Sequence, residues 1–498
     1  MTKPRKKNAT PKPAKPPAGV KNVAVWEDDP GPHNPSTLTP VDVAAPNQAA
    51  KPYPYKISGT TPPAAVYATG TAHFRFYATA AALRRTADFW AKVVPAGTKW
   101  QVGKTLPVAL DSGVDLNAFY TRGDGQDTPG LHFFHATVAG HTYFSCESPD
   151  VCCHEMGHAV LDSIRPQLFD AQTIEAAAFH EGFADVAAIL SDLQVPSFRA
   201  AVLAETGGTL NRTSRLSRLA EQLGAAIRIQ HPDAVDPDSL RNAANSFFYR
   251  DPQTLPPSAP ASTLSSEPHS FSRVFSGAFL DILSAMFKLQ NATPTADDLV
   301  KATLDAARVL VNAILAAPVV PDYYSQIAAH MVTASQTAPF DGKYTAAIKS
   351  AFVRRGILSL QAATTLSSIN VRNLPKAAVT AATISKAPAS LPKASISAAA
   401  YGLSRASLVV HTAEDAKRFG VTSAALGVLG SLEPRSPQNA AESYTEDLFQ
   451  RGRVSVGEHA NATTGALHSM AFTTHIVVEE NGELVLKRRA FECGLTFD

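Results

Sequence analysis

Residues 154–158 and Glu181 have the types and the spacing of zinc ligands. Residues 154–158 read HEMGH, and residues i and i+4 lie on one face of a helix, so His154 and His158 could bind one metal ion. Glu181 begins the later sequence EGFAD and would complete a His, His, Glu set that leaves the fourth coordination position open. We therefore expect His154, His158 and Glu181 to be the ligands of one zinc ion.

Two further carboxylates and one histidine have places around such a site. Glu155 neighbours the first ligand and would take a proton from a zinc-activated water. Asp185 lies one helical turn beyond Glu181, where it could accept a hydrogen bond from the far nitrogen of a ligand histidine and fix its tautomer. His180 faces about 100° away from Glu181 on a helix, so we place it beside the ligands or at the rim of the cleft. A helix can carry HExxH by chance, and the second segment is what favours a metal site.

The segments around both motifs have patterns typical of helices. Ser148 and Pro149 make a good helix start, with Ser as the N-cap and Pro in the first turn. That helix should end before Pro166, and a second helix should run from about residue 173 to residue 193. Strand-like runs fall between residues 100 and 120, upstream of both helices.

The bulk composition is that of a globular protein with an unusual N-terminus. The chain has 498 residues, enough for two or three domains, and its net charge of +2 gives no general indication of a nucleic-acid partner. No stretch is long and apolar enough to span a membrane. Residues 1–65 are rich in Pro, and we expect a basic, largely disordered leader there. They lack the apolar core of a Sec-type signal peptide, which favours a cytoplasmic protein or export by a non-classical route.

The C-terminal part has a different character. Residues 358–400 are rich in Ala and Ser and are expected to be a linker. Residues 401–498 are expected to form a separate module of unknown role. They contain a clear β-hairpin signal, because Asn481-Gly482 lies between strand-like runs and favours a type I′ turn. The oligomeric state of the protein is left open by the sequence.

The four cysteines are too few for a disulfide scaffold. Cys152 and Cys153 directly precede His154, but thiolate ligands would close the metal site and weaken its Lewis acid, so we interpret both as small buried helix residues. A disulfide between Cys146 and one member of this pair stays open.

The two motifs together resemble the thermolysin-like gluzincin metallopeptidases, which carry HExxH on one helix and ExxxD on the next. Asn117 and Ala118 resemble the family's edge strand, whose Asn and Ala hydrogen-bond the backbone of an extended peptide. Arg241 resembles the arginine that holds the carbonyl of the residue after the scissile bond. His269 resembles the histidine that donates to the tetrahedral oxyanion. The resemblance implies a metallopeptidase domain over residues 66–357.

The resemblance also implies a fold and an activity. The fold is α+β, with an N-terminal mixed-sheet lobe, a C-terminal helical lobe and the zinc helices at the cleft between them, followed by the C-terminal extension. The activity is that of a zinc endopeptidase acting on a peptide or protein substrate, with Glu155 as general base. The alternative is a catalytically weak or latent zinc-binding module that binds a partner.

Three departures from the family pattern bear on activity. The family usually has a Tyr between the zinc helices that also stabilises the oxyanion, and Phe169 stands in that place; losing one such donor can cost about 10²-fold in rate. The acidic partner of His269 is not at its usual offset, and Glu267 is interpreted as a substitute or, with more weight, as a loop carboxylate. Asp150 and Asp192 are too few for a convincing calcium site, so we expect weak or no calcium binding.

Overall fold

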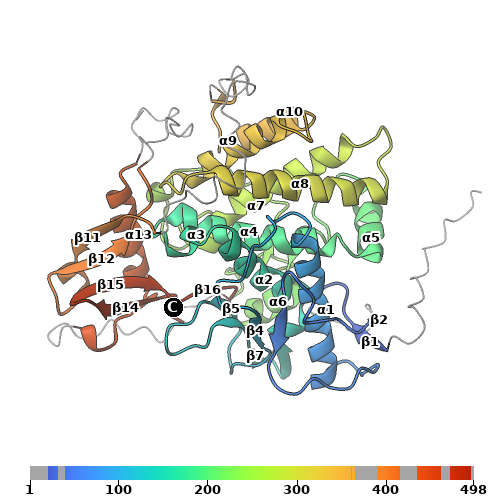
Figure 1. Ribbon diagram of the computed structural model, residues 1–498, viewed down its shortest axis with the longest axis horizontal. Coiled ribbons are helices and arrows are strands. Elements are labelled where there is room, and N and C mark those ends of the chain that lie inside the picture. The colour runs from blue at the N-terminus through green and yellow to red at the C-terminus, as the bar shows by residue number, and fades with distance from the viewer. Residues whose placement is uncertain are drawn as a thin grey trace, which may run out of the picture.

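A computed structural model shows a mixed α+β architecture, with several small sheets around a central group of helices (Figure 1). The fold class predicted from the sequence is therefore confirmed at this coarse level. The structure describes residues 21–31, 40–360, 362–364, 390–415, 435–460 and 472–494.

One five-stranded mixed sheet adjoins the helix that carries HEMGH. Its strands are β3 (Tyr55–Ile57), β4 (Leu106–Ala109), β5 (Ala118–Thr121), β6 (Gly130–Phe133) and β16 (Ala490–Glu492). The order is β16-β5-β6-β4-β3, with β3, β4 and β6 mutually parallel and β5 antiparallel to β6. The strand at one edge, β16, comes from the far C-terminal part of the chain and pairs antiparallel with β5. The sequence did not predict that fifth strand.

The N-terminal leader is more ordered than its composition predicts. β1 (Asn22–Val25) pairs antiparallel with β2 (Val41–Ala44), and most side chains of β1 are buried. A largely disordered leader over residues 1–65 is therefore wrong for the described part of that range. Contact of this short apolar run with α1 (Ala72–Trp90) outweighs the Pro-rich composition around it. Residues 1–20 and 32–39 lie outside the described part.

Two packed helices carry the candidate ligands. α2 (Pro149–Ile164) starts after Ser148, whose hydroxyl caps the first turn as predicted, and α4 (Ile174–Asp192) has a threonine N-cap. The helices approach closely at Gly157, where an added Cβ would lie 2.7 Å from Ala187 Cβ. Glycine in the middle of HEMGH therefore lets α2 and α4 come near enough to share a site.

Further helices build outward from α4 (Figure 1). α7 (Pro268–Lys288) packs on α4, and α8 (Ala296–Ala316), α9 (Tyr323–Gln336) and α10 (Thr345–Arg354) follow. The shorter elements of this part are α3 (Gln167–Asp170), α5 (Pro196–Thr206), α6 (Glu221–Gln230), β7 (His135–Val138), β8 (His141–Phe144), β9 (Arg218–Leu219) and β10 (Arg241–Asn242).

The C-terminal residues form a second five-stranded sheet with a helix. The elements are β11 (Lys393–Ser397), β12 (Ser407–His411), α13 (Pro437–Gln450), β13 (Val454–Ser455), β14 (His475–Glu480) and β15 (Glu483–Arg488), with strand order β11-β12-β15-β14-β13. The predicted hairpin is confirmed: β14 pairs with β15, and Asn481 and Gly482 have φ of 52° and 82°. β11 belongs to this sheet, so the predicted linker boundary at residue 400 is wrong. Residues 365–389 lie outside the described part.

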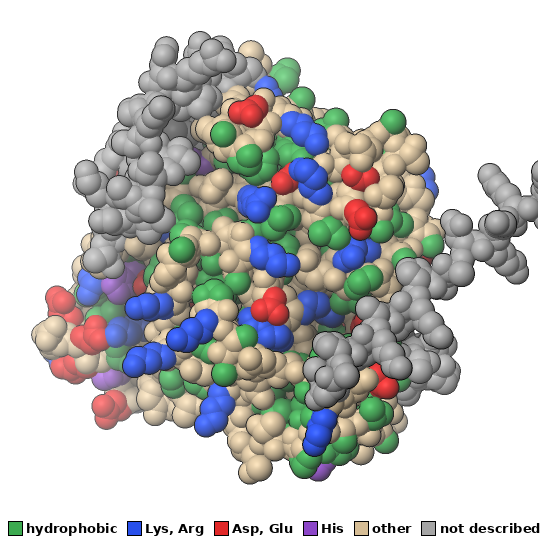
Figure 2. Space-filling view, turned by 45° about the vertical axis from the view of Figure 1, so that its right-hand side comes forward, with side chains coloured by type: hydrophobic (Ala, Val, Ile, Leu, Met, Phe, Trp, Pro, Cys, Tyr) green, Lys and Arg blue, Asp and Glu red, His purple; other side chains and the backbone are tan. Residues whose placement is uncertain are grey.

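The described helices can be compared with the length and apolar character that a membrane span needs. None of the described helices is both long and apolar enough to cross a bilayer, although α4 and α5 together meet that criterion with a bend of 103° between them. Figure 2 shows Lys and Arg side chains scattered over one face, with small hydrophobic spots between them. This mixed surface fits the low net charge of the sequence.

Candidate metal centre

The three predicted ligands meet where α2 and α4 pack together. Nε2 of His154 lies 3.4 Å from Oε2 of Glu181, and Nε2 of His158 lies 3.6 Å from the same oxygen. The two histidine Nε2 atoms are 3.1 Å apart. All three ligand atoms lie within 4.8 Å of one another and are buried. The expectation that these residues share one site is confirmed for their geometry.

The chemistry of these three side chains fits a zinc ion. Two imidazole nitrogens and one carboxylate oxygen are a ligand set that zinc accepts, with a further position left for another group. Oε2 of Glu181 is buried and accepts no hydrogen bond from any described residue, so this oxygen is available to a metal ion. Burial and the neighbouring His154 hold the pKa of His158 well below its usual value, so its imidazole is in the neutral, metal-binding form.

A second layer of side chains orients the two histidines. Oδ1 of Asp185 lies 3.1 Å from Nδ1 of His154, as predicted, and accepts a hydrogen bond from Nη2 of Arg241 at 2.9 Å. Burial alone would raise the pKa of Asp185, but the Arg241 guanidinium lowers it to about 2. Nδ1 of His180 shares a hydrogen bond with Nδ1 of His158 at 2.8 Å. His180 therefore supports a ligand and does not replace one, which agrees with its predicted place.

Glu155 is a buried carboxyl with no hydrogen-bond partner among the described residues. Neither of its oxygens has a hydrogen bond to a described residue, and burial raises the pKa of this group well above its usual value. Its carboxylate belongs to a group with His154 in which the candidate ligand atoms lie within 4.8 Å of one another. A buried carboxyl beside metal ligands, with a strongly shifted pKa, is a candidate for an acid or base in such a site.

His269 completes the site from the first turn of α7. Its Nε2 lies 3.4 Å from Oε2 of Glu181, and its Nδ1 is hydrogen-bonded to Oε1 of Glu267 at 2.7 Å. The weightier interpretation of Glu267, as a loop carboxylate, was therefore wrong. Glu267 is the N-cap of α7, and its other oxygen accepts from the backbone at the helix start. Burial lowers the pKa of His269, but Glu181 and Glu267 outweigh burial and raise it to about 9.

Arg241 faces the site from β10. Its Nε and Nη2 donate to Asp185, whereas the buried Nη1 has no hydrogen-bond partner among the described residues. One donor of Arg241 is therefore unsatisfied among the described residues, and the peptide-binding role that the resemblance implies stays a prediction. Phe169 is buried near the site and brings no hydroxyl to it.

The predicted peptide-binding edge, Asn117 and Ala118, is already occupied. The Ala118 carbonyl accepts a hydrogen bond from the backbone N–H of Cys493 at 2.8 Å. Asn117 donates from Nδ2 to Glu492 at 3.0 Å and accepts at Oδ1 from the backbone N–H of Gly494 at 2.9 Å. No sequence pattern indicates this contact, since it joins residues far apart in the chain.

The cysteines do not form disulfides. All four are free and buried. Cys152 and Cys153 direct their sulfurs toward the carbonyls of Cys146 and Ala82, which confirms them as buried helix residues. Cys493 is different, because its sulfur belongs to the candidate ligand group with His154 and Glu155. Sequence reasoning missed it, as nothing near Cys493 in the chain resembles a metal motif.

Asp150 and Asp192 lie in a buried acidic cluster with residues that the sequence did not connect to them. Asp28 and Asp29 join them from the N-terminal segment. Their partners are Arg215, which pairs with Asp28 at 2.8 Å, and Arg85, which pairs with Asp192 at 2.5 Å. Burial raises the pKa of Asp28 to about 7 and those of Asp29 and Asp192 to about 6. Weak or absent calcium binding stays a prediction.

We expect the stability of the variant Asp28→Asn, relative to wild type, to increase as pH rises. A carboxyl whose pKa is raised in the folded state stabilises the protein below its unfolded pKa of about 4, and that contribution is lost as pH rises through about 7. The free energy of unfolding of the variant, relative to wild type, should rise by about 1–3 kcal/mol between pH 5 and pH 8. Urea denaturation at both pH values measures this difference. A difference that stays constant or falls would contradict it.

No protein-family model matches the sequence, and no curated protein matches it. The chemistry of the site therefore has to follow from the three buried ligands, the unpaired Glu155 and the residues that orient them.

Proposed function

We propose that this protein is a zinc-dependent endopeptidase. The observation that carries the proposal is the meeting of His154, His158 and Glu181 in one buried site, with the unpaired carboxyl of Glu155 beside them. The mixed sheet, the two ligand helices and the helices beyond them support a thermolysin-like arrangement as part of the same proposal.

Each residue of the site would have a defined task. A zinc ion held by the three ligands supplies a Lewis acid that lowers the pKa of water and polarises a carbonyl. Glu155 would take the proton of the attacking water and deliver it to the leaving amine. His269, held protonated by Glu267, would donate from Nε2 to the developing oxyanion.

The substrate would be an extended peptide. The edge of β5 that β16 covers would pair with it antiparallel once β16 moves away, with the Asn117 side chain and the Ala118 carbonyl as fixed hydrogen-bonding groups. Nη1 of Arg241 would donate to a carbonyl of the same peptide. Asp185 would keep both His154 and Arg241 in place.

A second candidate is a latent or catalytically weak metal-binding module. Two observations favour it: Phe169 offers no hydroxyl to an oxyanion, and β16 covers the edge of β5. In that case the metal would be bound but peptides would be cut slowly or not at all.

The test is metal content together with cleavage of unfolded casein, with and without a chelator. About one zinc per chain and chelator-sensitive cleavage support the endopeptidase. Zinc without cleavage, in wild type and in a variant whose β5 edge is freed, supports the second candidate. A protein that binds no zinc overturns both.

A further inference from the structure

A C-terminal segment of the chain occupies the edge of β5 that a peptide substrate would need. Residues 490–492 pair antiparallel with residues 119–121 of β5. Further hydrogen bonds follow on both sides of this pairing. The hydroxyl of Thr121 donates to the carbonyl of Arg489 at 2.6 Å, and the backbone N–H of Cys493 donates to the carbonyl of Ala118 at 2.8 Å. The segment 489–494 thus lies along β5 in the direction expected of a substrate.

Side chains fix this segment on the other wall of the site. The Glu492 carboxylate is held by Arg453 at 2.7 Å and by Asn117 at 3.0 Å. The Glu492 carbonyl accepts a hydrogen bond from Nε2 of His269 at 2.5 Å. That nitrogen is the one proposed to serve the oxyanion, so it is unavailable to a substrate while the segment is in place.

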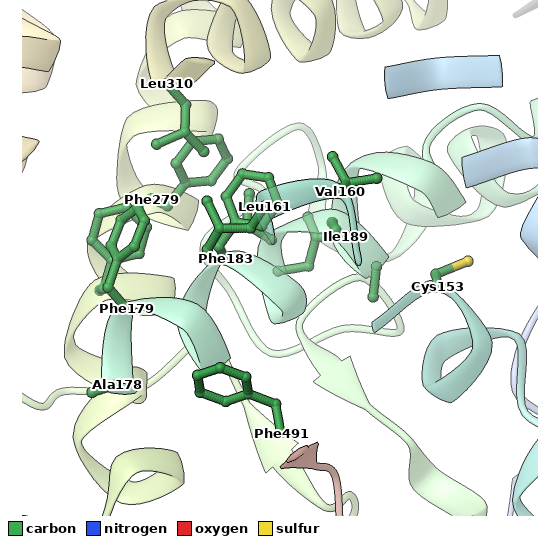
Figure 3. Packing of buried hydrophobic residues seen from close by; sticks show 14 of the residues in the cluster. Cys153, Val160, Leu161, Ala178, Phe179, Phe183, Ile189, Phe279, Leu310 and Phe491 are labelled. Atoms are coloured by element: carbon green, nitrogen blue, oxygen red, sulfur yellow. The ribbon is translucent and has the colours of Figure 1, made fainter. Parts of the chain in front are cut away.

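Phe491 holds the segment against the ligand helices. Its ring stacks on the ring of His180 at 3.8 Å between centroids and on that of His158 at 5.0 Å. Figure 3 shows Phe491 pointing from its strand toward the helix that carries Ala178 and Phe179. The ring is 2% exposed, so burial of an aromatic side chain stabilises the occupied state.

Cys493 brings a sulfur close to one of the metal ligands, His154, and to Glu155. Its Sγ, a carboxylate oxygen of Glu155 and a ring nitrogen of His154 lie within 4.8 Å of one another, and all three residues are buried. His154 is also a member of the His, His, Glu group. A thiolate is a strong zinc ligand, and three protein ligands leave one position for it.

We propose that residues 489–494 are a built-in inhibitory strand whose Cys493 sulfur is the fourth ligand of the metal. The proposal rests on the metal site of the proposed function. The thiol gives up its proton to solvent when it binds the metal. The strand then blocks the edge of β5, the Nε2 of His269 and the open coordination position together.

Gly494 shows how closely the segment fits. An added Cβ at this position would lie 2.7 Å from Oδ1 of Asn117 and 2.7 Å from the carbonyl oxygen of Leu116. A larger residue cannot be accommodated there unless the segment moves away from β5. Gly494→Val therefore displaces the strand without touching a metal ligand.

Cobalt spectroscopy tests the ligand. Cobalt-loaded wild type and the control Cys146→Ser, which changes another buried free cysteine, should both show thiolate-to-cobalt absorption in the near ultraviolet. Cys493→Ser should lose this absorption while still binding one cobalt per chain. If cobalt binds but the absorption is missing from wild type, or persists in Cys493→Ser, then Cys493 is not the fourth ligand. If no cobalt binds, the proposed function itself fails.

Activity tests the inhibition. Gly494→Val should cleave unfolded casein about tenfold faster than wild type or more, because a site that is mostly occupied acts only through its free fraction. A synthetic peptide of residues 489–494 should inhibit the variant, and its Cys→Ser form should inhibit less. Thermal unfolding and cobalt content identify a variant that fails to fold, in which case the two peptides are tested on Cys493→Ser.

Two outcomes would overturn the inhibitory strand. One is a wild-type protein that binds metal and cleaves casein as fast as an active, metal-bound Gly494→Val. The other is an intact mass showing that the chain is cut between Glu492 and Cys493, because the segment would then be a substrate. In either case the metal site and the endopeptidase stand, so the two proposals fail separately.

Discussion

Glu155→Gln should abolish peptide cleavage while the metal stays bound. Glutamine has nearly the same shape as glutamate but cannot take a proton, and a positioned general base contributes about 10²–10⁴-fold to rate. Glu155 has no described hydrogen-bond partner to lose, so its replacement should cost little stability. The measurement is casein cleavage and zinc content of the variant, both in the wild-type background and together with Gly494→Val.

His158→Ala is the matched control for this experiment. It removes a ligand and should lose both the metal and the activity, whereas Glu155→Gln should lose only the activity. Cleavage by Glu155→Gln at the wild-type rate, with zinc bound, would show that Glu155 is not the base and would leave the endopeptidase without its central step.

Asp185→Ala should damage both the stability and the metal affinity of the protein. The carboxylate of Asp185 is shared by His154 and by Arg241, whose side chain is 7% exposed. Its removal leaves a buried guanidinium without a counter-charge, and breaking such a pair costs about 3–5 kcal/mol. Loss of the hydrogen bond that orients a ligand histidine should also weaken zinc binding by about 10–100-fold.

Urea denaturation and a zinc competition assay measure these two effects. Asp170→Ala is the control, because the Asp170 side chain, which pairs with Arg122, is 43% exposed whereas that of Asp185 is 1% exposed, and exposed pairs contribute only about 0–1 kcal/mol. In the double variant Asp185→Ala/Arg241→Ala the stability should recover in part but the zinc affinity should not. An Asp185→Ala protein with wild-type zinc affinity would mean that Asp185 does not orient His154.

The ligand helices could be predicted because their information is local. The four-residue spacing of His154 and His158, the Ser148 cap and the position of Asp185 one turn after Glu181 each depend on the geometry of a single helix. Beyond this, only the packing of α2 against α4 was needed to bring His154 and His158 next to Glu181. That packing follows from their small and apolar faces.

Contacts between distant parts of the chain could not be predicted in this way. In the sequence, β16 is a short segment that follows a hairpin, and nothing in that segment indicates that it pairs with β5. The Pro-rich composition of the leader led to a prediction of disorder that is wrong for the described residues, because a short apolar run there forms the buried strand β1. Glu267 was undervalued because its role depends on the first turn of α7, which places its side chain beside His269.

β16 is translated long after β5, and this order has a consequence for the newly made chain. Asn117 and Glu492 are 375 residues apart, so at about 5–20 residues per second the ribosome needs roughly 20–75 s to make the second after the first. During that interval β5 has no partner on one side, and an unpaired strand edge is a template for association with other chains. Under the proposed function, the newly made part that holds the ligands would be exposed to two hazards, aggregation and unregulated cleavage of its neighbours, which would end together when β16 pairs with β5.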